Sequence, residues 1–293
     1  MGNFLSKYHN MDLLHGSLWD KIIFFSMPLA LTSILQQLFN AADVAVLGNF
    51  VGNDAVAAVG NNIPIIGLVV NLFVGISLGA NVVVARYIGM KDPNNANDAV
   101  HTAFSLAIII GLVIALLGVP LADSIVSWLG VPDNVKEGAS TYLRVYFLGM
   151  PFIAMYNFEA ALFRSKGDTN TPLIALAYAS LFNIAGNLIV VLVFGMQTDG
   201  VALTTVLSNG LCAFYLFFKL RKESGFLHLD YKKILEFRPR KARAIVSIGL
   251  PAGIQGMVFS LSNLLIQSAI NSLGTDVMAA SAAAFTIEIN VYC

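Results

Sequence analysis

The sequence predicts an all-α protein that crosses a membrane many times. Hydrophobic residues make up 57% of the 293 residues, charged residues only 12%, and the mean hydropathy is +0.75. An average soluble domain is roughly 45–50% apolar and about 25% charged, and a single soluble domain of this length cannot bury so much apolar surface. The apolar runs are continuous rather than alternating, which favours membrane-spanning helices over a β-barrel.

Seven apolar runs are long enough to span a bilayer, and an eighth begins before the sequence ends. They cover residues 22–47, 57–85, 99–120, 141–162, 172–195, 200–219, 244–271 and 277–293. Residues typical of turns separate them, among them Gly48-Asn49 and the segments 91–95, 131–134 and 167–172. The polar start and the length of the first run are unlike a signal peptide.

Basic residues predict the orientation in the membrane. Fifteen of the 17 Lys and Arg residues lie in the N-terminal tail and in the loops after spans 2, 4 and 6. The positive-inside rule therefore places the N-terminus in the cytoplasm of a multi-pass protein of the cell (inner) membrane. The 17 acidic residues balance the basic ones, so no excess of positive charge is present for nucleic acid. The long loop after span 6 predicts two units, residues 1–235 and 236–293.

An internal repeat predicts a larger architecture than eight spans. Pro28 aligns with Pro251, and the segment 52–58 (GNDAVAA) aligns with 274–280 (GTDVMAA) after one deletion. Span 7 then repeats span 1, although chance similarity between apolar helices is the alternative. A parallel repeat of this kind predicts two six-helix lobes and 12 spans when intact, with the present sequence truncated in span 8.

Polar residues inside the spans are candidates for an ion-coupling site. Asp43 lies in an otherwise uncharged helix, on one face with Gln36 and Asn40, and a carboxylate at mid-membrane costs about 2.5–3.5 kcal/mol. Asn183 and Asn187 share a face of span 5, and Thr205 opens span 6 at a similar depth. Each residue also has a purely structural explanation. Asp43 could lie at the membrane interface, the two asparagines could hydrogen-bond neighbouring helices together, and Thr205 could cap the start of its helix. Such oxygen ligands suit Na⁺, and a carboxylate alone suits H⁺.

The sequence also predicts a role or a position for four other residues in the spans. Pro28 and Pro251 lie inside spans 1 and 7 and are candidate hinges, because each removes a helical hydrogen bond. Glu159 is expected at the membrane interface beside Arg164, and Glu288 is a second candidate intramembrane acid.

Several classes of protein have no support in the sequence. No phosphate-binding loop is present, which argues against ATP hydrolysis by that route. No nucleophile constellation or metal-spaced histidines indicate an enzyme. Two cysteines, Cys212 and Cys293, do not make a disulfide framework.

The sequence resembles the multidrug and toxic compound extrusion (MATE) transporters over nearly its whole length. The resemblance rests on LQQLFNAAD at 35–43, GNDAVAAVG at 52–60, RSKGDTNTP at 164–172 and GLPAG at 249–253. It implies two six-helix lobes around a central cavity and export of compounds by Na⁺ or H⁺ antiport.

By position, the resemblance implies an ion-coupling set of Asp43, Asn183, Asn187 and Thr205. This sequence departs from the family pattern at two places. Asn187 stands where several H⁺-coupled members carry an acidic residue, and Phe259 and Ile266 stand at positions of the second lobe where an acid would be expected. These departures resemble the DinF-like branch. The candidate residues of the substrate cavity are Gln36, Gln37, Asn40 and Asn157.

We therefore expect a secondary antiporter that exports small amphipathic or cationic compounds. It would use H⁺ or Na⁺ and no other cofactor, and would work as a monomer in membrane lipid without ATP or nucleic acid. The alternative is a lipid-linked oligosaccharide flippase of the same superfamily, which would need cationic cavity residues, and only Arg144 approaches a span interior. A passive channel and a membrane-embedded enzyme are less well supported.

Overall fold

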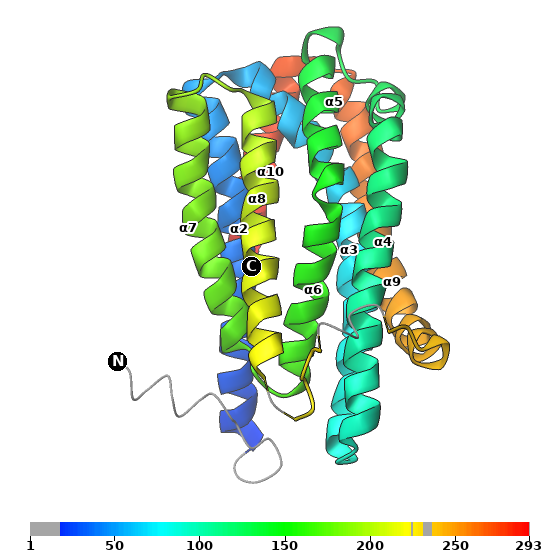
Figure 1. Ribbon diagram of the computed structural model, residues 1–293. Helices are drawn as coiled ribbons and strands as arrows, with labels where there is room; N and C mark the ends of the chain where they lie inside the picture. Colours follow the sequence, from blue (N-terminus) through cyan, green and yellow to red (C-terminus); the bar gives the residue numbers. More distant parts are fainter. Residues whose placement is uncertain (1–17, 224, 231–235, 293) are drawn as a thin grey trace.

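Long apolar runs fold into long helices that lie side by side (Figure 1). The computed structural model describes residues 18–223, 225–230 and 236–292. The regular elements in this part of the chain are all helices: α2 (Leu18–Phe50), α3 (Asn53–Gly89), α4 (Pro93–Trp128), α5 (Asp133–Leu148), α6 (Met150–Ser165), α7 (Asn170–Leu192), α8 (Thr198–Lys222), α9 (Pro239–Asn271) and α10 (Thr275–Tyr292). Lys7, Lys232, Lys233 and Cys293 lie outside the described residues, as does the predicted boundary at residue 235.

The helices agree with the predicted membrane spans. Six of them are long and apolar enough to cross a membrane, and a seventh span results if α5 and α6 count as one. These comprise α2, α3, α4, α7, α8 and α9, and they contain the predicted spans 1, 2, 3, 5, 6 and 7 with small shifts at their ends. Helix α10 covers most of the predicted eighth segment. The multi-pass, all-α prediction is confirmed.

The fourth predicted span, 141–162, is not a single helix. It is divided at Gly149 into α5 and α6, which meet at an angle of 50°. Pro151 in the first turn of α6 has no backbone N–H to continue the helix of α5. A Cβ on Gly149 would come within 2.4 Å of Val206 Cγ2, so glycine allows this corner to approach α8. In contrast, α2 and α9 continue as helices through Pro28 and Pro251.

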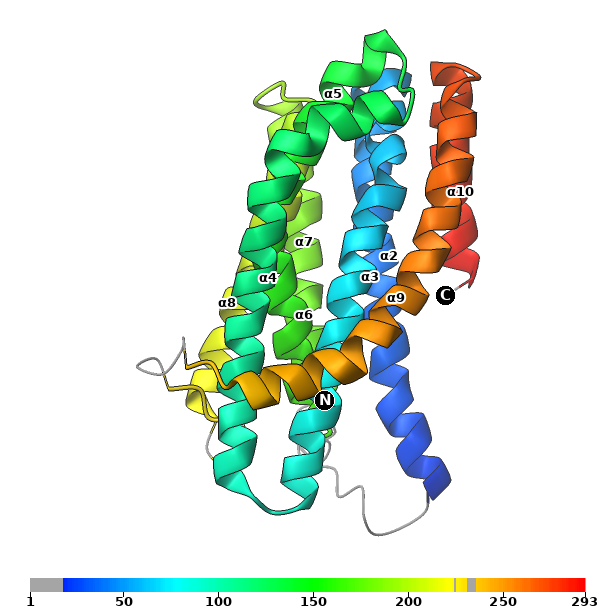
Figure 2. The same cartoon turned by 90° about the vertical axis from the view of Figure 1, so that its right-hand side faces the viewer.

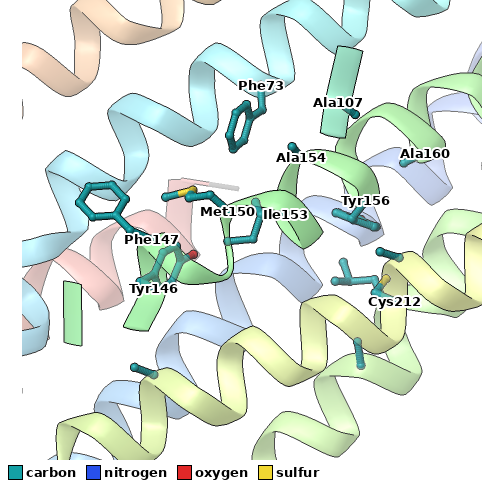
Figure 3. Close-up of a cluster of buried hydrophobic side chains, with 14 of the residues drawn as sticks. Phe73, Ala107, Tyr146, Phe147, Met150, Ile153, Ala154, Tyr156, Ala160 and Cys212 are labelled. Atoms are coloured by element: carbon teal, nitrogen blue, oxygen red, sulfur yellow. The ribbon is translucent and has the colours of Figure 1, made fainter. Parts of the chain in front are cut away.

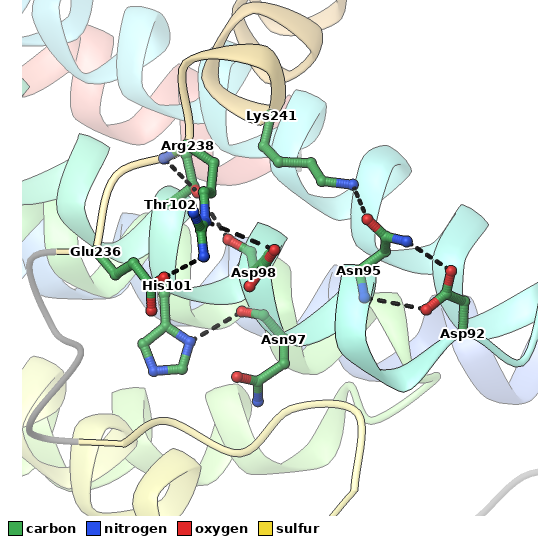
Figure 4. Close-up of polar contacts among 9 residues, drawn as sticks. All are labelled: Asp92, Asn95, Asn97, Asp98, His101, Thr102, Glu236, Arg238 and Lys241. Atoms are coloured by element: carbon green, nitrogen blue, oxygen red, sulfur yellow. Dashed lines mark hydrogen bonds and ion pairs between the residues drawn. The ribbon is translucent and has the colours of Figure 1, made fainter.

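The two ends of the bundle carry different connections (Figures 1 and 2). At one end lie the α3–α4 and α6–α7 turns and the described residues between α8 and α9, which are 223, 225–230 and 236–238; we call these described residues the linker and this end the linker end. At the other, the far end, lie the α2–α3, α4–α5 and α7–α8 turns. The linker is held against α4, because the Asp230 backbone N–H donates to His101 Nε2 at 3.0 Å and Arg238 pairs with Asp98 at 3.7 Å (Figure 4).

The closest helix contact joins α3 to α9. A Cβ on Gly75 would lie 2.1 Å from Gly253 Cα, and one on Gly79 would lie 2.1 Å from the Ile245 carbonyl oxygen. Further along the same contact, Asn71 Nδ2 donates to Ser260 Oγ at 2.9 Å. Gly75 and Gly79 therefore let the two helices approach at backbone distance, and we call this contact the α3–α9 seam.

Buried aromatic and aliphatic side chains fill the space between α3, α4, α6 and α8. Phe73 and Met150 are fully buried there, and Tyr156 and Cys212 lie within the same cluster (Figure 3). This core fixes α6 and α8 relative to α3 and α4, and it supports the polar site described next.

Candidate functional site

Asp43 is buried against α7 and α8 in the half of the bundle nearer the far end. Its side chain is 3% exposed although it belongs to the first described helix of the chain. Asn187 Nδ2 of α7 donates to Asp43 Oδ1 at 2.6 Å, and Thr205 Oγ1 of α8 donates to Asp43 Oδ2 at 2.9 Å. Three helices thus meet at one carboxyl group.

Asn183 closes this network. Its Nδ2 donates to Thr205 Oγ1 at 3.2 Å, and its Oδ1 accepts from Asn187 Nδ2 at 3.2 Å. Asn183 and Asn187 are both 0% exposed, and Thr205 is 2% exposed. We call Asp43, Asn183, Asn187 and Thr205 the polar site.

Helix geometry explains how these residues come together. Asn183 and Asn187 are four residues apart, so they lie on one face of α7 one turn from each other. Gly186, between them in sequence, lets α8 approach, since a Cβ there would lie 2.4 Å from Thr204 Cγ2. The close approach of α7 to α8 allows short asparagine and threonine side chains to reach across.

No cationic side chain pairs with Asp43 among the described residues. Burying an unpaired carboxylate costs several kcal/mol, and two hydrogen bonds from neutral donors return about 1.5–3 kcal/mol each. These two terms are of similar size, so the Asp43 carboxyl group could exist with or without a bound proton or cation.

One atom of the polar site is left without a partner. Asn187 Nδ2 makes two hydrogen bonds, whereas the buried Asn187 Oδ1 makes none within the described part of the chain. With the Asp43 carboxylate, the Asn183 carboxamide oxygen and the Thr205 hydroxyl, it completes a set of oxygens that hard cations prefer. These residues fit Na⁺ as well as H⁺.

The other predicted polar residues of span 1 do not join this site. Gln36 and Asn40 are exposed and Gln37 is half-buried, although Gln36 and Asn40 share a helical face with Asp43. Asn157 of α6 is half-buried and donates to the Ile153 carbonyl oxygen at 2.8 Å.

Two aromatic residues near Asp43 were not expected from the sequence. Tyr142 and Tyr146 of α5 are buried, and their rings stack with centroids 5.9 Å apart. Their spacing of four residues in an amphipathic segment is the only signal that could have found them.

The expectation for Glu159 is wrong. Its side chain is 0% exposed rather than interfacial, and it forms no ion pair with Arg164. Five residues turn a helix by about 140° beyond a full revolution, so the two side chains leave α6 in different directions. Glu288, the other candidate acid, is exposed on α10.

Arg144, the candidate cation for a flippase, is already paired. Its guanidinium forms an ion pair with Asp123 of α4, and both side chains are about half exposed. Neither residue belongs to the polar site.

Comparison with known proteins gives consistent results. The family model MatE matches residues 28–189. The probable multidrug resistance protein YoeA of Bacillus subtilis is 29% identical over 272 residues, which cover 90% of this chain and 58% of that protein. The multidrug export protein MepA of Staphylococcus aureus (strain MRSA252) is 22% identical over 265 residues, covering 90% and 58%.

Solved structures with the same fold belong to transporters. A multidrug resistance MATE family transporter of the MOP superfamily in an outward-facing conformation has a TM-score of 0.82 and 25% identity, covering 96% of this chain and 62% of that one. Its inward-facing conformation has a TM-score of 0.80 and 25% identity, covering 90% and 61%. The chain thus spans about three-fifths of the length of these relatives.

Proposed function

The chain belongs to the MatE family of MATE transporters, and from this premise we propose that the protein exports amphipathic or cationic compounds in exchange for H⁺ or Na⁺. Relatives named as multidrug resistance and multidrug export proteins support the substrate class. The protein would act as a monomer in the inner membrane, with its N-terminus and the linker end in the cytoplasm.

The observation that carries this proposal is the buried Asp43 without a cationic partner. A carboxyl group with two hydrogen-bond donors and no counter-charge can accept H⁺ or Na⁺ and release it again. A permanent Arg or Lys partner would remove that capacity, because the positive charge could not leave.

Exchange follows if the ion and the exported compound favour different conformations of the lobe. Binding of either ligand then lowers the affinity for the other by the same factor. Each charge that moves through 100 mV supplies about 2.3 kcal/mol, so one ion per cycle can drive substantial accumulation outside.

The Asn187 Oδ1 atom, which has no hydrogen-bond partner within the described residues, suggests how the site would accept Na⁺. Rotating the Asn187 amide by half a turn would present Oδ1 instead of Nδ2 to Asp43. Two oxygens facing each other repel unless a cation or proton lies between them. Proton binding to Asp43 needs no such rotation, because Asn187 Nδ2 and Thr205 Oγ1 can hydrogen-bond either protonation state.

The substitution Asp43→Asn tests this function. Inside-out vesicles with an acidic or a Na⁺-rich interior should take up the cationic dye ethidium when they contain the wild-type protein. Asp43→Asn keeps the shape of the side chain but cannot exchange a charge, so we expect loss of gradient-driven uptake with normal membrane insertion.

Asp54→Asn is the matched control, because Asp54 is exposed at the start of α3 and lies outside the polar site. It should leave uptake unchanged. Wild-type uptake by D43N under both gradients would reject the coupling role, and the gradient that drives the wild type identifies the ion.

A further inference from the structure

Glu159 of α6 is a second buried acid that the proposed exchange does not use. Its side chain is 0% exposed, and neither carboxylate oxygen has a hydrogen-bond partner within the described residues. A carboxylate in such a position would lack both water and donors, so burial strongly favours the protonated, neutral form.

The unpartnered polar atoms are concentrated on two helices. Within the described residues, every buried side-chain N or O without a hydrogen-bond partner belongs to α6 or α7: Tyr156 Oη, Glu159 Oε1 and Oε2, Arg164 Nε, Ser180 Oγ and Asn187 Oδ1. Native proteins leave few buried polar groups unpaired, and water commonly bridges those that remain. Helices α6 and α7 both pack against α8.

These atoms lie at graded depths between the linker end and Asp43. At 1.5 Å per residue, Glu159 lies about 9 Å and Tyr156 about 14 Å from the linker end of α6. Ser180 lies about 15 Å and Asn187 about 26 Å from the linker end of α7. Ser180 is three residues before Asn183, on the α7 face that carries the polar site.

Few ionisable groups face Glu159. Cys212 of α8 is buried and interacts electrostatically with it. Tyr156 and Arg164 share its helix and form no ion pair with it. From α3 and α4, the core cluster that packs on α6 includes the apolar Phe73 and Ala107 (Figure 3). These surroundings offer no set of oxygens for a metal ion, so the ligand that fits is a proton.

We propose that Glu159 is a second proton site, which relays protons between Asp43 and the linker end. A proton leaves the Asp43 carboxyl group and reaches the Glu159 carboxylate through water and the hydroxyls of Ser180 and Tyr156. Glu159 then releases it to solvent when the lobe opens at the linker end. This inference rests on the proposed H⁺ exchange and adds an exit route to it.

Infrared difference spectroscopy of the reconstituted protein tests the proposal. A protonated carboxyl group has a C=O stretching band that a carboxylate lacks, and the band shifts in D₂O. The comparison uses the D43N protein, in which Asp43 cannot contribute a band. We expect the band at neutral pH in D43N and its loss when Glu159→Gln is added. The exposed Glu137 of α5 gives the control Glu137→Gln, which should keep the band.

Ethidium uptake driven by an acidic interior supplies the second readout. E159Q should fall toward the rate without a gradient, whereas E137Q should match the wild type. An unchanged band when E159Q is added to D43N, or a lost band with unchanged uptake in E159Q, would overturn the relay. If E159Q does not fold, the double variant D43N with Glu288→Gln gives the test. The carboxyl C=O band at neutral pH must persist in this variant, because neither Asp43 nor Glu288 remains to supply it. If the band is absent, the proposal is rejected.

Failure of the proposed function would look different. Wild-type vesicles would then show no uptake under a proton gradient, while the infrared band would still report whether Glu159 holds a proton.

Discussion

At the scale of single residues, the hydrogen bonds of the polar site depend on which atoms act as donors and which act as acceptors. The sequence predicted that Asp43, Asn183, Asn187 and Thr205 lie at similar depth, because helical spacing and loop positions fix depth. It could not predict that Thr205 donates to Asp43 while accepting from Asn183, since this depends on how α7 and α8 are rotated about their axes. Their role in ion coupling stays a prediction.

Two consecutive threonines of α8 allow a test of the polar site by one hydroxyl group. Thr205→Val removes the donor to Asp43 at nearly constant volume, and a hydrogen bond to a charged group contributes about 1.5–3 kcal/mol. That hydrogen bond stabilises the empty Asp43 carboxylate, so its loss should raise proton affinity about tenfold to a hundredfold, measured as a lower H⁺ concentration for half-maximal ethidium uptake. Na⁺ would instead lose a ligand oxygen and would need a higher concentration for half-maximal uptake.

Thr204→Val is the matched control. Thr204 is equally buried, but its hydroxyl donates only to the Gly200 carbonyl oxygen of its own helix, at 3.0 Å. Equal shifts in both variants would mean that Thr205 contributes to α8 packing and not to ion binding.

Glu159 shows why a neighbour in sequence can mislead. Arg164 is close along the chain and suggested an interfacial ion pair, yet burial of α6 among α3, α4 and α8 depends on contacts far away in sequence. The residues next to Glu159 in sequence therefore do not reveal whether its side chain is buried, because the helices that cover it lie far away in the chain.

At the scale of elements, hydropathy predicted the spans well and their shapes poorly. The apolar run 141–162 contains Gly149 and Pro151, which together produce the only marked break within a predicted span of the described chain. Helices α2 and α9 continue through Pro28 and Pro251, and the role of these two prolines as hinges stays a prediction.

The α3–α9 seam predicts unequal effects of two similar substitutions. Gly75→Ala places a methyl group 2.1 Å from the Gly253 backbone, which cannot move aside without separating the helices. Overpacking of this kind costs about 1–3 kcal/mol. The melting temperature of the purified protein in detergent should fall.

Gly67→Ala on the same helix is the control. Its methyl group would meet only the Ser260 hydroxyl oxygen, at 3.3 Å, and a side chain can yield slightly. If G67A lowers the melting temperature as much as G75A, the seam is not the tight contact described.

At the scale of the whole molecule, the two members of the sequence repeat have similar geometry. Helices α2 and α9 each have 33 residues, and each is followed by a turn whose glycine, Gly52 or Gly274, has positive φ. Proline spacing and turn glycines are local features, so the sequence could reveal the repeat. The relative placement of α9 on α3 depends on distant contacts and was not predicted.

Orientation in the membrane is testable by cysteine labelling. In a background lacking Cys212 and Cys293, single cysteines at the exposed positions Asn53 and Asp133 of the far end should react with an impermeant maleimide in intact cells. A cysteine at the exposed Lys222 of the linker end should react only after the cells are opened. The reverse pattern would invert the orientation given by the basic residues.

The α3–α9 seam has a consequence for the order of synthesis. Asn71 and its partners Gly256 and Ser260 are 185 and 189 residues apart in the chain. At about 5–20 residues per second, the ribosome needs roughly 10–40 s after making Asn71 to reach Gly256 and Ser260. Throughout that interval the glycine face of α3 faces lipid or a temporary neighbour, so the nascent chain depends on the membrane insertion machinery to keep this face available.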